Sequence, residues 1–229
     1  EEVNLRPLFK NQVENQEFTS SCSANAAVSN TEFVIAKKYG HLPDFSYPEL
    51  SRRFVYYEGR RVDGLETIDR GSVIRSVVGQ MAAKGVCEEA LFPFFTSPAS
   101  MIQVPSTPCY TEAVRHKVLR YERLTTLDNM LECLSRGYPF IFGFQTYTES
   151  MRIAKATGVM PMPVGTRAGG HAICVVGHNL TKRVVIIRNS YGIAWGDAGY
   201  CTMPFDYVTR TDLSSDHWTI QDVQWDPDA

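Results

Sequence analysis

Hydrophobic positions in the first part of the chain recur at the spacing of an α-helix. An Ala-rich stretch follows Ser20-Ser21 and carries apolar side chains as far as Ile35. Lys37, Lys38 and Gly40 come next. Serine before an apolar stripe is a helix start signal, and basic residues followed by glycine are a stop signal. The pattern predicts a helix that ends at Gly40 and has Cys22 in its first turn.

Three shorter helices are predicted by the same signals. The sequence Ser46-Tyr47-Pro48-Glu49 has the spacing of a capping box and indicates a helix that continues through Val55. Another is expected from Ser72 to Gly85, with Val73, Ile74, Val77, Val78 and Met81 on one side. The last begins at Leu127 and stops at Gly137.

The pattern changes to strands after Pro139. Short apolar runs at 140–144, 172–176 and 184–187 predict three strands, and the turn-like residues 178–182 join the last two as a hairpin. Residues 146–170 are interpreted as a long irregular connection. Helices followed by strands are typical of an α+β chain with two segregated halves.

Length and charge exclude several function classes. The chain has 229 residues, is 44% hydrophobic and has a formal net charge of -2. It can therefore bury a core, and its charge gives no case for nucleic acid or an anionic membrane surface as a partner. No apolar run approaches the roughly 18 residues of a membrane helix. The absence of a starting Met is interpreted as a trimmed or processed chain.

Four residues in this framework have the chemistry of a thiol catalyst. A cysteine at a helix N-terminus, such as Cys22, has its thiolate stabilised by the helix dipole. His171 follows Gly169-Gly170 and heads an apolar strand, from which an imidazole can project as a base. Asn189 ends the next strand of the hairpin and could orient that ring. Gln16 lies six residues before Cys22. Taken singly, each is also compatible with a structural role.

In this order and spacing, the four residues resemble the papain-like cysteine peptidases. The resemblance covers about Val13 to Pro204 and is strongest in the segment from Arg188 to Tyr200, which contains Asn189-Ser190-Tyr191-Gly192. It implies Cys22 as nucleophile, His171 as base, Asn189 as its orienting partner and Gln16 as an oxyanion donor.

The resemblance also implies the architecture. It indicates an α+β, two-lobed fold in a single domain, with a mainly helical lobe at about 13–120 and a mainly antiparallel β lobe at about 121–229. The N-terminal segment would cross to the β lobe, and the active site would lie in the cleft between the lobes.

Several positions depart from the family pattern. Ser23 and Tyr191 stand where tryptophan is usual, and Thr19 stands where many members have a disulfide cysteine. Gly71-Ser72 resembles the Gly-Gly pair that binds extended substrate, with the second glycine lost. We therefore expect a divergent member without the usual disulfide near the nucleophile.

Further residues are expected to bind substrate by the same resemblance. Gly71 and Ser72 would offer main-chain groups, with Asp69 and Ile74 in the cleft wall. The remaining candidates lie in the strand-rich half: Gly143, Gly170, Tyr191 and Trp195.

Other chemistries fit the sequence less well. His171, Cys174 and His178 have zinc-like spacing, but on a strand His171 and Cys174 point to opposite faces. No metal and no cofactor are expected. Two alternatives stay open: a non-catalytic papain-fold protein that binds peptides, and a thiol amidase or transpeptidase that shares the acyl-enzyme.

Partners and cysteine pairing complete the expectations. The resemblance implies a peptide or protein substrate and an inhibitory propeptide upstream of Glu1, hence a zymogen; we expect a monomer in a secreted or lysosome-like compartment. Of the six cysteines, only Cys87 and Cys109 lie in loop-like surroundings where a disulfide is plausible.

The two glycines Gly143 and Gly170 predict the substrate preference. They imply a roomy, uncharged second subsite, so peptides with Leu or Phe at that position should be cleaved fastest. A positional library of fluorogenic peptides measures this preference. A library in which Arg or Glu ranks first would contradict it.

Overall fold

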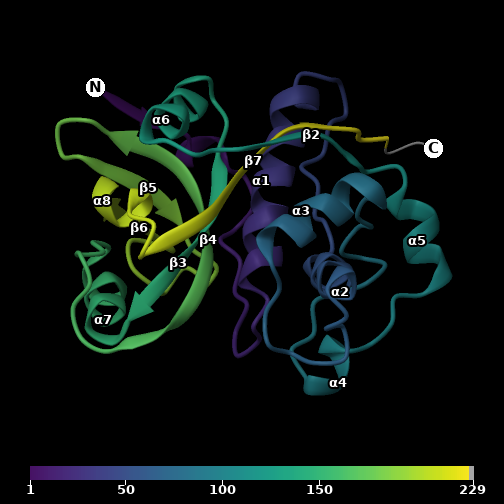
Figure 1. Ribbon diagram of the computed structural model, residues 1–229. Helices are drawn as coiled ribbons and strands as arrows, with labels where there is room; N and C mark the ends of the chain where they lie inside the picture. The colour runs from purple at the N-terminus through teal and green to yellow at the C-terminus, as the bar shows by residue number, and fades with distance from the viewer. Residues whose placement is uncertain (227–229) are drawn as a thin grey trace. The chain divides into compact units, whose positions relative to one another are not determined.

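The computed structural model describes residues 1–226, and they form two compact units (Figure 1). The β unit comprises Glu1–Asn15 and Arg123–Thr219, and the helical unit comprises Gln16–Glu122 and the chain from Ile220. Each unit therefore contains segments from both ends of the sequence.

Antiparallel strand pairs build the β unit. The strands are β1 (Glu2–Asn4), β3 (Phe140–Tyr147), β4 (Arg167–Asn179), β5 (Val184–Arg188), β6 (Tyr200–Pro204) and β7 (Ser214–Val223), of which the residues up to Thr219 belong to this unit. Their order is β7-β3-β4-β5-β6, with β1 on β4 and β2 (Val118–Arg123) beside β7. β4 and β5 form the expected hairpin, in which Cys174 lies opposite Arg188.

Every second side chain of β3 points into the core of the β unit. Phe140, Phe142 and Phe144 alternate with residues of the other face and are all at most 3% exposed. The ring of His217 stacks on Phe142. Helices α6 (Leu127–Ser135), α7 (Thr148–Thr157) and α8 (Phe205–Thr209) flank the curved strands in Figure 1.

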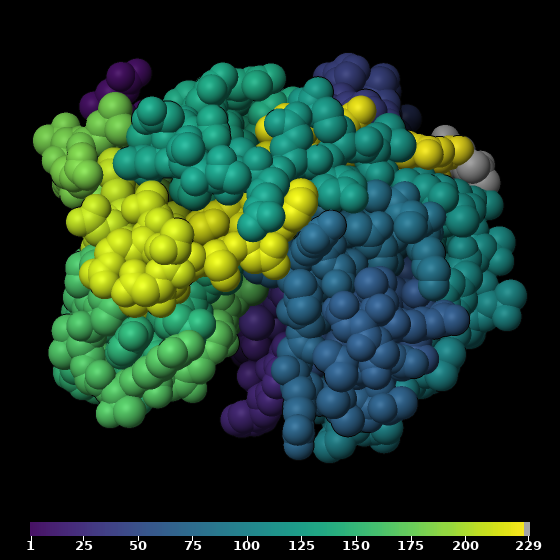
Figure 2. All heavy atoms as spheres, viewed as in Figure 1, coloured from purple at the N-terminus to yellow at the C-terminus, as the bar shows by residue number. Residues whose placement is uncertain are grey.

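The helical unit is built on three helices that pack against one another. They are α1 (Cys22–Tyr39), α2 (Arg52–Val62) and α3 (Ile74–Ala83), followed by the short α4 (Pro98–Met101) and α5 (Thr107–Ala113). Atoms of the stretch that contains α2 and α3, in blue, occupy a large part of the visible face of this unit in Figure 2. Gly59 permits the close approach of α2 to α3, since a Cβ there would lie 2.6 Å from Val77.

A buried arginine ties loops of the helical unit to α2. Arg60 has no exposed surface, and its guanidinium donates to the main-chain oxygens of Tyr56, Ile68 and Met101. Burial of an unpaired guanidinium would be costly, so these three acceptors hold their segments in place.

The helix predicted from Ser46 to Val55 is wrong in its position. The helix begins at Arg52, because Ser51 caps it by accepting the Phe54 N–H at 3.1 Å. The preceding residue, Leu50, donates its N–H to the Glu32 carboxylate on α1 at 2.8 Å. That tertiary bond holds the chain before Ser51 outside the helix and overrides the capping-box signal.

The interpretation of 146–170 as an irregular connection is also wrong. Residues Thr148–Thr157 form α7, which ends at Gly158 in the left-handed conformation with φ 72°. The segment's end belongs to β4, which begins at Arg167, four residues before His171. Cys109, placed in loop-like surroundings by its sequence, lies on α5. The helices starting at Cys22, near Ser72 and at Leu127 are confirmed.

No helix in residues 1–226 is both long enough and apolar enough to cross a membrane.

Gly85 is the glycine at which an added side chain should lower the free energy of unfolding most. Its φ is 86°, and a Cβ would lie 1.8 Å from the Ala113 main-chain oxygen. Gly85→Ala should lower the free energy of unfolding by about 2–4 kcal/mol. The matched control is Gly64→Ala, since Gly64 has φ 70° with nothing within 4 Å of a Cβ; it should lose only about 1 kcal/mol. Urea unfolding measures both, and equal losses would contradict the steric argument.

Candidate active site

Cys22 is the first residue of α1, and its side chain is half-buried. The N-cap residue Ser21 does not cap the helix with its side chain. Its hydroxyl instead bonds Thr19 Oγ1 at 2.7 Å and the Asn25 amide at 2.9 Å. The turn before Cys22 is thereby fixed by side chains, and the thiol stays at the positive end of the helix dipole.

Gln16 closes a tight turn six residues before Cys22. Its Nε2 donates to the Thr19 main-chain oxygen at 2.9 Å, and the Thr19 N–H and hydroxyl both donate to the Gln16 oxygen. The side chain is 5% exposed. These bonds hold the carboxamide in one orientation, as an oxyanion donor requires.

The two serines that depart from the family pattern meet in the structure. Ser23 follows Cys22, and its hydroxyl hydrogen-bonds the hydroxyl of Ser72. Gly71, beside Ser72, has φ 94° and is half-buried. Ile74, expected in the cleft wall, is only 5% exposed and packs inside the helical unit. Sequence alone gives no signal that pairs Ser23 with Ser72, which are 49 residues apart.

In the β unit, His171 on β4 is joined to Asn189 just beyond β5. His171 Nε2 lies 2.8 Å from Asn189 Oδ1, and the Ser190 N–H also donates to that oxygen at 2.8 Å. An amide oxygen can only accept hydrogen bonds, so the proton in the His171–Asn189 bond must lie on Nε2. Nδ1 is therefore the imidazole nitrogen that can exchange a proton with a thiol.

Aromatic rings enclose the His171 imidazole. Tyr191 stacks on it with centroids 4.8 Å apart and an interplanar angle of 19°, while Phe144 meets it edge-on at 5.7 Å. The Tyr191 hydroxyl lies 3.5 Å from Nδ1. Trp195, 6% exposed, packs against Tyr191 edge-on. Trp195 thus supports Tyr191 from within the core of the β unit.

The two glycines of the expected second subsite lie on β3 and β4. Gly143 is half-buried and pairs with Ala172, and Gly170 is exposed and pairs with Gln145. A Cβ at Gly170 would have nothing within 4 Å. The face of β4 that carries Gly170 is therefore open, and it is the face opposite to the His171 side chain.

The other five cysteines are buried thiols. Each is at most 3% exposed, and none forms a disulfide. Burial raises the pKa of Cys174 to about 12 and raises the pKa of Cys201 and Cys87 as well. Cys109 lies close enough to Cys87 to raise its pKa further, yet both remain thiols and the plausible bridge is not formed. Cys133 donates its thiol to main-chain and hydroxyl oxygens inside the β unit.

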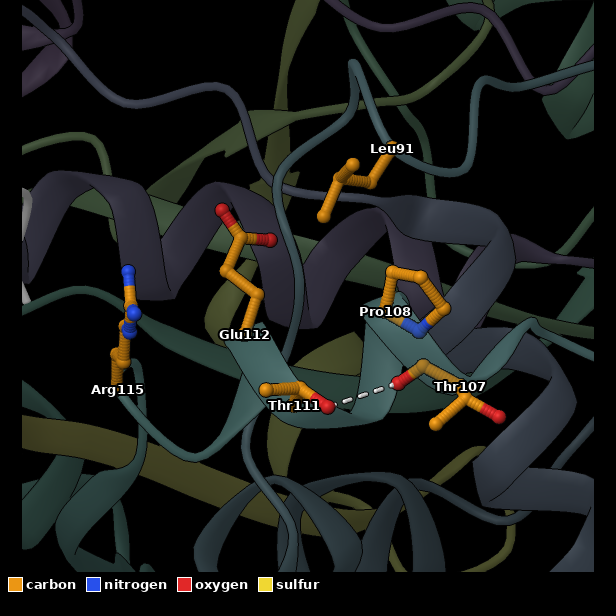
Figure 3. A pocket seen from close by; sticks show the side chains of 6 residues that line it. All are labelled: Leu91, Thr107, Pro108, Thr111, Glu112 and Arg115. Atoms are coloured by element: carbon orange, nitrogen blue, oxygen red, sulfur yellow. Dashed lines mark hydrogen bonds between the residues drawn. The ribbon is translucent and has the colours of Figure 1, made fainter.

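No three His, Cys, Asp or Glu side chains in the described part of the chain gather as a metal site. A separate pocket of about 470 Å³ lies on the helical unit beside α5 (Figure 3). Its lining residues are Leu91, Thr107, Pro108, Thr111, Glu112 and Arg115. The Glu112 carboxylate already accepts the Glu88 N–H at 2.9 Å. None of the candidate catalytic residues lines this pocket.

Comparison with known proteins identifies the family. Residues 2–217 match the family model described as papain family cysteine protease. The chain belongs to this family. Papain-family membership covers both units described above, because the match begins in β1 and ends in β7.

Similarity to individual proteins supports this family assignment. An uncharacterized peptidase C1-like protein of Acanthamoeba polyphaga mimivirus is 34% identical over 89% of this chain and 67% of its own. Ananain of Ananas comosus is 25% identical over 85% of this chain, which spans only about half, 52%, of ananain. The crystal structure of xylellain, a cysteine protease from Xylella fastidiosa, is 32% identical, covers 96% of this chain and 85% of its own, and has a TM-score of 0.86.

Stacking of Tyr191 on His171 predicts a catalytic effect of the ring. A tyrosine face stabilises a cationic imidazole, so Tyr191→Leu should lower kcat/KM about tenfold. Tyr191→Phe keeps the ring and tests the hydroxyl alone, and it should retain most of the activity. Steady-state hydrolysis of a fluorogenic peptide measures both. Equal losses in the two variants would mean that the hydroxyl, and not the ring, matters.

Proposed function

We propose that this chain hydrolyses peptide bonds through a thioester formed on Cys22. The observation that carries the proposal is the setting of the six thiols: five are buried, and only Cys22 is partly exposed, at the N-terminus of a helix. The thiolate is the reactive form of cysteine, and a helix N-terminus favours it.

His171 would serve as the base. With the proton on Nε2 held by Asn189, Nδ1 would accept the thiol proton, which gives an imidazolium and a thiolate. The stacked Tyr191 ring favours that cation. Asn189 orients the imidazole and does not itself exchange a proton.

Hydrolysis then proceeds in two steps. The Cys22 sulfur attacks the peptide carbonyl carbon, and negative charge develops on the carbonyl oxygen. The Gln16 amide and the Cys22 N–H would stabilise that charge, each by roughly 3 kcal/mol. His171 gives its proton to the leaving amine, and the C–N bond breaks to leave a thioester. Water, deprotonated by His171, displaces the thiol and releases the acid.

The alternatives differ from this proposal in defined ways. Peptide binding without catalysis does not require the Gln16 turn or the His171–Asn189 bond. Their presence therefore favours the hydrolase over the binding protein. A thiol amidase or transpeptidase would share the acyl-enzyme and differ in its acceptor. A propeptide before Glu1 stays a prediction of the family resemblance. A monomeric state and a secreted or lysosome-like compartment stay predictions as well.

Cys22→Ala should abolish peptide hydrolysis without lowering the unfolding temperature by more than a few degrees. Titration with an epoxysuccinyl thiol inhibitor, followed by mass spectrometry, should place one adduct on Cys22. The matched control is Cys133→Ala, which removes a buried thiol and should keep turnover per titrated site. Full activity of Cys22→Ala would refute the proposal. A single adduct on Cys22 together with no hydrolysis of any peptide would favour the binding protein.

A further inference from the structure

A hydrogen-bond network joins the expected peptide-binding segment Gly71-Ser72 to the turn before Cys22. At its centre is the Asp69 carboxylate, which is half-buried. Its Oδ1 accepts the Ser20 N–H at 2.9 Å and the Tyr56 hydroxyl at 2.5 Å. The same Tyr56 oxygen accepts the Gly71 N–H at 3.1 Å. One carboxylate oxygen therefore binds the turn before Cys22 directly and reaches Gly71 through the Tyr56 hydroxyl.

Tyr56 is held rigidly enough to act as such a link. Its side chain has no exposed surface. The Arg60 guanidinium carbon lies 3.7 Å from the centroid of the Tyr56 ring. Arg60 also donates to the oxygen of Ile68, the residue before Asp69, at 2.6 Å. Burial, and then the bond to Asp69, raise the pKa of Tyr56, so the hydroxyl keeps its proton and can donate.

A second link joins the same two segments a few residues further along. The hydroxyls of Ser23 and Ser72 are hydrogen-bonded to each other. The Ser20 hydroxyl also reaches the Asp69 main-chain oxygen at 3.5 Å. Each link crosses 49 residues of sequence. Together they leave the segment 69–72 little freedom to move relative to the N-terminus of α1.

We infer that Asp69 and Tyr56 are positioning residues for catalysis, which hold the Gly71-Ser72 main chain in register with Cys22. The inference rests on the proposed function, since register matters only if substrate pairs with Gly71-Ser72 while Cys22 attacks it. Such placement lowers KM for peptides long enough to reach Gly71 and does not affect shorter ones. Asp69 also fixes Ser20, so it contributes to the placement of the nucleophile itself.

The two residues should therefore give different kinetic signatures. Tyr56→Phe keeps the buried ring but releases the Gly71 N–H, so KM for an extended peptide should rise about tenfold, with kcat changed less than about twofold. KM for a minimal ester that ends before Gly71 should not change. Asp69→Ala should raise KM in the same way and lower kcat as well, because the Ser20 N–H is also released. Asp69→Asn keeps an acceptor oxygen, so its KM and kcat should stay close to those of the wild-type chain.

Controls separate positioning from folding and from the proposed function. Rates are expressed per Cys22 titrated with the epoxysuccinyl inhibitor, so a variant that folds poorly loses titratable sites and not turnover per site. The matched variant Asp63→Ala removes an exposed carboxylate that accepts a hydrogen bond from the Ser76 hydroxyl at 3.0 Å, and it should leave KM and kcat unchanged. An unchanged KM of Tyr56→Phe for the extended peptide would overturn the inference. So would equal losses on the extended and minimal substrates. Failure of Cys22 to titrate in the wild-type chain would instead refute the proposed function.

Discussion

The register in which β4 pairs with β3 and β5 is the constraint on which the site residues of the β unit depend. In this register His171 and Asn189, 18 positions apart in the chain, are joined by a hydrogen bond of 2.8 Å. A shift of one residue would turn His171 to the opposite face of the sheet. The alternating core of Phe140, Phe142 and Phe144 fixes the neighbouring strand and therefore that face. Packing thus decides which side of the sheet carries the imidazole.

Local signals in the sequence predicted much of this arrangement. The start of α1 at Cys22 and the β4–β5 hairpin follow from apolar spacing and turn residues, which act over a few positions. Because both are local, they place Cys22 at a helix N-terminus and His171 near Asn189 without knowledge of the fold. The family resemblance then supplies roles for residues that spacing alone leaves undecided.

Local signals could not predict features that depend on contacts between distant parts of the chain. α2 starts at Arg52 and not at Ser46, because Glu32 on a different helix binds the Leu50 N–H. α7 is a different case, because Thr148–Thr157 contain no Gly or Pro and end at Gly158 in a left-handed conformation, which are local helix signals. The Gly- and Pro-rich residues that follow it led to the interpretation of the whole segment as a loop. Ile74 illustrates the same limit at the site, since its burial depends on how α3 packs. The bonds of Asp69 and Ser72 span 49 residues and leave no periodic trace.

The noncovalent attachment of Gly71-Ser72 has a consequence for redox chemistry. Thr19 replaces a cysteine that forms a disulfide in many papain-family members, and the neighbouring Ser20 is held by Asp69 instead. A thiol nucleophile requires reducing conditions, and thiols also attack disulfides. If Cys22 is the nucleophile as proposed, reduction would activate it without breaking a crosslink beside it, because all six cysteines are thiols. Reducing conditions that keep the proposed nucleophile as a thiol would therefore leave the hydrogen bonds between residues 20–23 and 69–72 intact.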